Sequence, residues 1–185
     1  MNSLFQAGLE LQNFIKQRKW SFCFIGGLAV IRWGELRMTQ DIDLCLLAEF
    51  GNEKKYFDSL LAVFNSRISD PRDFALKNRV MLLYASNNVA VDISLSGLLF
   101  EKRMIERATP FSYAPECSLN TCSAEDLIVL KAFANRPKDW IDVEGIIIRQ
   151  KGHLDDNYIF NQLTPLCELK EAPEIIDKLD NFMNK

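Results

Sequence analysis

Three aspartates have the spacing of a catalytic metal site: Asp41, Asp43 and Asp92. Asp41 and Asp43 alternate with apolar residues in segment 41–47, which has the period of a β-strand, so both carboxylates share one face. Three carboxylates that meet on one sheet can bind a pair of divalent cations through oxygen alone, an arrangement that suits phosphoryl or nucleotidyl transfer. These aspartates therefore predict catalytic residues that also bind Mg²⁺ or Mn²⁺.

Asp92 is the third candidate because it interrupts an otherwise apolar strand. The branched apolar residues of segment 89–95 fall at alternate positions, and Asp92 lies on the other face between two small residues. This segment and the preceding segment 79–84 flank a polar turn, which predicts an antiparallel hairpin. Asp70 and Asp73 are the alternative third carboxylates, but they fall in a less regular stretch.

The apolar surroundings of Asp43 favour a bound partner over an ordinary surface acid. Asp43 is flanked by Ile42 and Leu44, and leaving a carboxylate unpaired in an apolar strand costs several kcal/mol. The alternative interpretation is that Asp41 and Asp43 are strand-end acids and that Asp92 faces solvent on an edge strand. We favour the metal site because both aspartate-bearing strands occur in the same chain as a glycine turn at positions 26 and 27.

Gly26 and Gly27 predict a phosphate-binding turn between strand 21–25 and helix 28–33. Glycine allows a phosphate to approach the backbone N–H groups closely, and the positive end of a helix dipole favours an anion there. The alternative is a tight turn with no ligand. The order of strand, glycines and helix, followed by the aspartates at 41–43, favours the phosphate site.

The remaining pattern predicts an α/β protein with a mixed sheet core, flanking helices and a C-terminal helical subdomain. Segments 3–18 and 52–65 carry apolar residues at helical spacing. From Ser123, which begins a capping box, the chain has a helical pattern. We therefore expect the core to span 1–115 and the helical subdomain 116–185, packed as one compact unit.

Composition narrows the class of protein. A chain of 185 residues with 48% hydrophobic residues can bury one sizeable core, and its net charge of -3 argues against a general nucleic-acid binder. The five cysteines are odd in number and scattered, which predicts reduced thiols and no zinc site. No apolar stretch reaches the ~20 residues of a membrane span, and the N-terminus is unlike a signal peptide, so we expect a cytoplasmic protein.

The order of these motifs resembles the nucleotidyltransferase superfamily. Its pattern is a Gly-Gly or Gly-Ser turn, a short interval, an Asp-x-Asp strand and an aspartate on a later strand. Segment 24–44 looks more narrowly like the AbiEii/MenT-type toxin-related branch, and segment 125–144 is similar to the helical stretch after the core in that branch. The resemblance covers residues 20–150 and is more specific for the superfamily than for the toxin branch.

This resemblance implies a function and further site residues. Family members transfer a nucleoside monophosphate from an NTP such as ATP, with Mg²⁺, to an RNA end such as that of tRNA or to a protein hydroxyl. Toxins of this type have an antitoxin partner. The residues implied to bind or orient the nucleotide are Arg37, Thr39, Lys131, Asp139 and Asp142. Gly27 stands where many catalytic relatives have serine, so one side-chain phosphate contact is missing.

Other interpretations stay open from the sequence. Arg37 can be a surface arginine, Lys131 can extend from an apolar helix to solvent, and Asp139 and Asp142 can simply favour the first turn of a helix. At the level of function, the rivals are an antibiotic nucleotidyltransferase and a catalytically silent nucleotidyltransferase fold that serves as a binding module.

Overall fold

The computed structural model describes residues 2–184 and divides into two compact units. The first unit comprises the described residues up to Leu28 together with Met38–Cys122. The second comprises Ala29–Arg37 together with the described residues from Ser123 onward. This division differs from the boundary at 115/116 drawn from the sequence, because one further strand belongs to the first unit and a short early segment belongs to the second.

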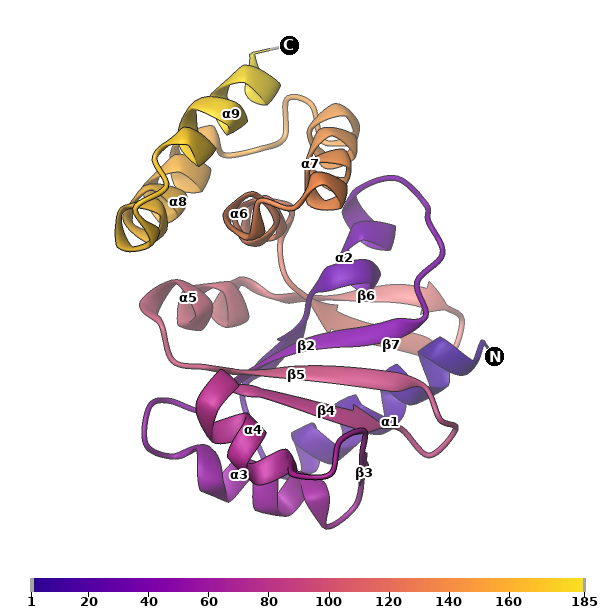
Figure 1. Cartoon of the computed structure of the whole chain (residues 1–185). Coiled ribbons are helices and arrows are strands. Elements are labelled where there is room, and N and C mark those ends of the chain that lie inside the picture. The colour runs from indigo at the N-terminus through magenta and orange to yellow at the C-terminus, as the bar shows by residue number, and fades with distance from the viewer. Residues whose placement is uncertain (1, 185) are drawn as a thin grey trace. The chain divides into compact units, whose positions relative to one another are not determined.

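The first unit is built on a mixed sheet (Figure 1). Within residues 2–184 the sheet has seven strands in the order β3-β4-β5-β2-β1-β7-β6. The strands are β1 (Phe22–Phe24), β2 (Asp41–Leu47), β3 (Asn65–Ser66), β4 (Val80–Tyr84), β5 (Ala90–Ser96), β6 (Thr109–Ala114) and β7 (Cys117–Thr121). β2 pairs with β5 and β1 with β7 in parallel, whereas the other neighbours are antiparallel. The predicted mixed sheet and the β4–β5 hairpin are confirmed.

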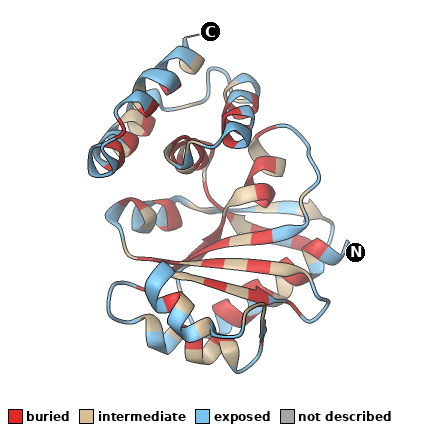
Figure 2. Cartoon of the chain, in the orientation of Figure 1, coloured by how far each residue is buried: buried red, intermediate tan, exposed pale blue. Residues whose placement is uncertain are grey.

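One face of this sheet carries the hydrophobic core of the first unit. The helices of the unit are α1 (Ser3–Gln17), α3 (Glu53–Leu61), α4 (Pro71–Asn78) and α5 (Leu99–Arg107). Alternate residues of the central strands pack with α1 and α3, and the buried set includes Leu11, Ile42, Leu60, Leu83 and Ile93. Figure 2 shows the resulting alternation of buried and part-exposed positions along β5. The aspartates of β2 and β5 therefore lie on the face opposite this core.

The second unit consists of helices. They are α6 (Ala124–Ala134), α7 (Pro137–Arg149), α8 (Asp156–Lys170) and α9 (Glu174–Met183), and the unit boundary falls inside α2 (Gly26–Trp33). The Ser123 side chain accepts a hydrogen bond from the Asp126 backbone, as the predicted N-cap requires. The Tyr158 hydroxyl donates to Asp126 Oδ1 at 2.7 Å, and Trp140 stacks on Phe182. These contacts join α6 to α8 and α7 to α9.

The segment after α3 corrects the sequence interpretation. The predicted helix 52–65 ends at Leu61, and Phe64, which follows the helix, packs in the hydrophobic core. Asp70 and Asp73 do not lie in an irregular stretch: Asp70 precedes α4, which has Pro71 at its first position, and Asp73 lies within it. The helix α5 and the strands β6 and β7 were also absent from the sequence interpretation.

Two further expectations concern the thiols and the membrane. All five cysteines are buried and free of disulfides, in line with the prediction that they are reduced. Across residues 2–184, none of the helices has the length and apolar character needed to cross a bilayer.

Candidate active site

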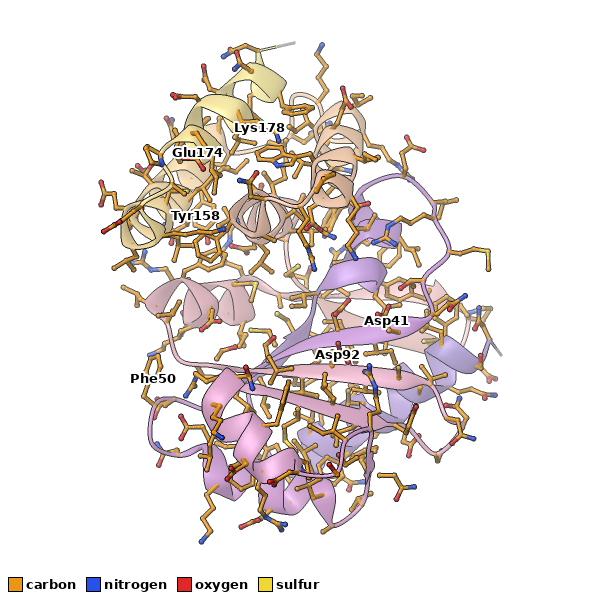
Figure 3. All side chains as sticks on the ribbon, viewed as in Figure 1. Asp41, Phe50, Asp92, Tyr158, Glu174 and Lys178 are labelled. Carbon is orange, nitrogen blue, oxygen red and sulfur yellow. The ribbon has the colours of Figure 1, made fainter. Side chains whose placement is uncertain are left out.

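The register of the parallel strands places the predicted catalytic aspartates together. Asp43 on β2 and Asp92 on β5 are direct cross-strand partners, and Asp41 lies two residues earlier, opposite Ala90. Asp41 is exposed, whereas Asp43 and Asp92 are half-buried. Figure 3 shows Asp41 and Asp92 on these neighbouring strands. Asp41 and Asp43 were expected on one face of their strand, and the parallel register places Asp92 beside Asp43.

Gly26 brings the backbone of the turn against the Asp43 carboxylate. Its φ is +55°, a left-handed conformation that favours glycine. A Cβ atom at this position would lie 1.9 Å from Asp43 Oδ2, so no other residue fits without moving the carboxylate. The Ile25 N–H also donates to the Asp43 carbonyl oxygen at 3.0 Å. The glycine turn and the Asp-x-Asp strand are therefore held together by a close packing contact and a backbone hydrogen bond.

Gly27 has an equally close neighbour, the side chain of Thr39. A Cβ atom on Gly27 would lie 2.3 Å from Thr39 Oγ1 and 2.7 Å from Thr39 Cβ. The same hydroxyl donates to Asp41 Oδ1 at 3.1 Å. Thr39 thus fills the space that a side chain at position 27 would need, and it places a hydroxyl between the turn and the first aspartate. A side chain at position 27 would therefore require Thr39 to move.

The substitution Gly27→Ser is therefore expected to lower the stability of the folded protein. Overpacking against Thr39 should destabilise the first unit by about 1–3 kcal/mol and disturb the Thr39–Asp41 hydrogen bond. The double variant Gly27→Ser/Thr39→Ala should recover most of this loss, because the space then opens. Urea denaturation of the wild type, both single variants and the double variant measures the coupling. A stabilised Gly27→Ser protein would contradict this packing argument.

The donor atoms of these aspartates suit a hard divalent cation, although they do not form a complete cage. Carboxylate oxygens are the ligands that Mg²⁺ prefers, and Mg²⁺ is commonly bound by one or two carboxylates together with substrate phosphates. Over residues 2–184, no three acidic, histidine or cysteine side chains are grouped closely enough to hold a metal by themselves. The oxygen donors of Asp41 and Asp43 are of the chemical type that such a cation binds.

Arg67 is a charged residue of this site that sequence analysis missed. Its guanidinium forms an ion pair with the Asp92 carboxylate. The Arg67 N–H donates to the Leu82 carbonyl oxygen at 2.9 Å, and Leu82 is the cross-strand partner of Asp92. An arginine in an unassigned loop carries no signal in the sequence. Only the pairing of β3, β4 and β5 brings it to the carboxylate.

Four other predicted nucleotide-binding residues form a charge network in the second unit, in which Lys131, Asp139 and Asp142 are buried and Arg37 is exposed. Lys131 Nζ donates to Asp139 Oδ1 at 2.9 Å and to Asp142 Oδ2 at 2.7 Å. Arg37 donates to both oxygens of Asp142, at 3.0 and 3.2 Å. Lys131 is only 7% exposed, so the alternative of a lysine that extends to solvent is wrong. Its charge is instead held between two carboxylates of α7.

The ionisation of Asp139 follows from the same network. Desolvation of the fully buried carboxyl would raise its pKa, but the hydrogen bonds from Arg136 and Lys131, with their positive charges, outweigh burial and hold the pKa below its ordinary value. Asp139 is therefore a carboxylate at neutral pH. Asp142 forms ion pairs with both Lys131 and Arg37, so the charge network extends from α6 and α7 to Arg37.

Solved structures of other proteins share this fold. The lincosamide antibiotic adenylyltransferase LnuA, in its lincomycin-bound crystal structure, is 14% identical, covers 76% of this chain and 94% of its own, and has a TM-score of 0.52. The antibiotic-resistance factor ANT(2'')-Ia in solution is 15% identical, with coverages of 92% and 94% and a TM-score of 0.56. An antigenic nucleotidyltransferase-like protein from Paracoccidioides brasiliensis is 14% identical, with coverages of 94% and 90% and a TM-score of 0.50. The fold is that of the nucleotidyltransferases.

The family follows from the sequence profile that matches most of the chain. The family described as nucleotidyl transferase AbiEii toxin, type IV toxin–antitoxin system, matches residues 16–163. The chain belongs to this AbiEii nucleotidyltransferase family. No curated protein matches it. The matched range includes the glycine turn, the three aspartates and the charge network of the second unit.

Proposed function

We propose that this protein transfers a nucleoside monophosphate from an NTP to a hydroxyl of RNA or protein, as the toxin of a type IV toxin–antitoxin pair. Family membership supports the reaction class and the antitoxin context. The observation that carries the proposed site is the row formed by the Gly26 turn, Asp43 and Asp92, in which the turn contacts one carboxylate and the parallel register supplies the other. A phosphate-binding turn and two carboxylates are thereby fixed on rigid elements.

Each residue of the row has a proposed role. The backbone N–H groups at the start of α2 bind phosphate oxygens of the NTP, favoured by the helix dipole. Asp41 and Asp43 would hold a Mg²⁺ or Mn²⁺ ion, which supplies positive charge to the reacting phosphate and the leaving pyrophosphate. Asp92 accepts a hydrogen bond from the acceptor hydroxyl and takes its proton as the oxygen attacks the α-phosphorus. The bond from the α-phosphorus to the bridging oxygen then breaks and releases pyrophosphate.

Thr39 adds a hydroxyl to the same proposed site. Its Oγ1 lies beside Gly27 and donates to Asp41. We propose that it supplies the polar contact that serine supplies in many relatives. Arg37, Lys131, Asp139 and Asp142 are proposed nucleotide-binding residues on the strength of family membership, and their mutual ion pairs would hold them in fixed positions.

The test is transfer of labelled nucleotide. Purified protein is incubated with each α-³²P-labelled NTP in turn, with Mg²⁺, Mn²⁺ or a chelator, and with total tRNA, total protein or a panel of lincosamides and aminoglycosides. Metal-dependent label on tRNA or protein supports the proposal. Label on an antibiotic alone would assign the drug-modifying activity instead. No transfer, together with no metal-dependent NTP binding by calorimetry, would identify a silent fold that serves as a binding module.

A further inference from the structure

A cavity lies within the second unit, lined by α7, the turn that follows it, the start of α8 and the end of α9. Its volume is about 380 Å³, at the small end of the range found for pockets that bind small molecules. Its apolar wall is formed by Ile147, Ile148, Leu154, Phe182 and Met183. Within residues 2–184, none of the proposed nucleotide-binding residues lines this cavity. The cavity is therefore a candidate site for a different kind of ligand.

The wall of the cavity is held in place by contacts within the protein. Phe182 on α9 stacks on Trp140 of α7, with ring centroids 5.4 Å apart and ring planes 14° from parallel. Lys178, one turn earlier on α9, places its ammonium 4.4 Å from the centroid of the Trp140 ring. Ile148 is 65% exposed although its side chain is apolar. A ligand that covers Ile148 and Phe182 would remove apolar surface from water without first having to order the helices.

Three charged side chains also line the cavity: Glu144, Lys151 and Asp156. All three are exposed, and within residues 2–184 none of them forms an ion pair with another side chain. Two carboxylates and one ammonium leave a formal negative charge beside the apolar wall. This charge favours a cationic ligand over an anionic one.

The chemistry of the lining excludes several other classes of ligand. In the described part of the chain, no side-chain hydroxyl, amide or imidazole group lines the cavity. A nucleobase or a sugar would therefore lose hydrogen bonds to water that this wall does not replace. A phosphate group would meet one ammonium and two carboxylates. The class that fits both the wall and the charge is a small organic cation with an apolar body.

We propose that this cavity binds a small organic cation with an apolar body, such as an alkylamine. The apolar body contacts α7 and α9, and the ammonium lies beside the carboxylates of Glu144 and Asp156. Because one ligand contacts three helices, its binding stabilises the folded second unit. The site takes neither the NTP nor the metal of the proposed function and does not depend on that proposal.

The test compares three probes with the same alkyl chain: hexylamine, hexanol and hexanoate. Protein with ¹³C-labelled isoleucine methyl groups is titrated with each probe and followed by NMR. Hexylamine should shift the signals of Ile147 and Ile148 and leave that of Ile93 in the first unit unchanged. It should bind about threefold more tightly than hexanol, because exposed charge pairs contribute a factor of this order, and hexanoate should bind most weakly.

Variants of the lining separate the contribution of the amine from that of the alkyl chain. Glu144→Gln/Asp156→Asn should lose the preference for hexylamine over hexanol, and Lys151→Met should weaken the binding of hexanoate further. Ile148→Ser should weaken the binding of all three probes. Ile141, which is 72% exposed on the same helix and lies outside the cavity, provides the matched control. Ile141→Ser should bind the probes as the wild type does.

Three results would each overturn the inference: equal binding of the three probes by the wild type, no shift at Ile147 and Ile148, or equal losses in Ile148→Ser and Ile141→Ser. Circular dichroism and melting curves show whether each variant is folded. A wild-type protein that binds hexylamine here but transfers no nucleotide would reject the proposed function and leave this site standing.

Discussion

Replacing Asp43 with asparagine should lower nucleotide transfer by about a thousandfold or more while leaving the fold intact. Asparagine keeps the shape of the side chain against Gly26, but it removes the negative charge that would hold the metal ion. A metal ion supplies several kcal/mol of transition-state stabilisation, and each ~1.4 kcal/mol lost lowers the rate tenfold. The measurement is single-turnover transfer of labelled nucleotide to the acceptor found for the wild type, over a range of Mg²⁺ concentrations.

The control for this loss is an aspartate of the same unit outside the row. Asp58 is 42% exposed and pairs with Arg72, so Asp58→Asn should leave the transfer rate unchanged. Calorimetry gives a second readout, because the metal-dependent part of NTP binding should disappear in Asp43→Asn and persist in Asp58→Asn. If Asp43→Asn retained transfer within tenfold of the wild-type rate, Asp43 would not be a metal ligand in the reaction.

The second large effect is on stability: Lys131→Met should destabilise the helical unit by about 3 kcal/mol or more. Lys131 is the common partner of Asp139 and Asp142, which are 0% and 7% exposed. Methionine preserves much of the packing volume but leaves two buried carboxylates with less compensation, which is the costly way to break a buried ion pair. Urea unfolding followed by tryptophan fluorescence measures the loss, since Trp140 belongs to the same helix as both aspartates.

The pH dependence of the stability difference between the wild type and Lys131→Met shows whether charge or packing causes it. Because the pKa of folded Asp139 lies below its ordinary value of 3.8, its ionisation stabilises the fold at higher pH, and this contribution is lost as the pH falls through the folded pKa. The stability difference between wild type and Lys131→Met should therefore be full above about pH 5 and shrink as the solution becomes more acidic. The exposed Lys138→Met on α7 serves as the control and should show little change. A pH-independent difference would point to packing instead of charge.

The strands that carry the aspartates could be predicted because their pattern is local. Segment 41–47 alternates in the sequence and is β2 with the same bounds, and the hairpin turn before β5 contains Asn88 with a φ of +61°. The burial of alternate residues in β5 then follows from the period of the strand. These features need no knowledge of distant residues.

The remaining features depend on pairing between distant segments, which the sequence pattern does not encode. Nothing in the loop after α3 marks Arg67 as a partner of Asp92, because the contact requires three strands in register. Gly27 could be recognised as a departure from relatives, but not as a position whose space Thr39 fills. Lys131 showed the limit of a helical pattern: the same spacing serves a solvent-directed lysine and a buried one, and the residues of α7 decide between them.

The parallel pairing of β2 with β5 has a consequence for the time at which activity arises. The β4–β5 hairpin joins neighbouring segments and can form soon after both are synthesised, whereas β2 must dock on its edge across the intervening α3 and α4. The parallel pairing of β1 with β7 forms only after residue 121 has been synthesised. Pairings of high sequence separation form slowly, because loop closure precedes the contacts that reward it. A ribosome-bound chain can therefore pair β1 with β2, and so place Gly26 against Asp43, before Asp92 joins them on β5, and any activity that needs all of these residues should begin only after most of the first unit has left the ribosome.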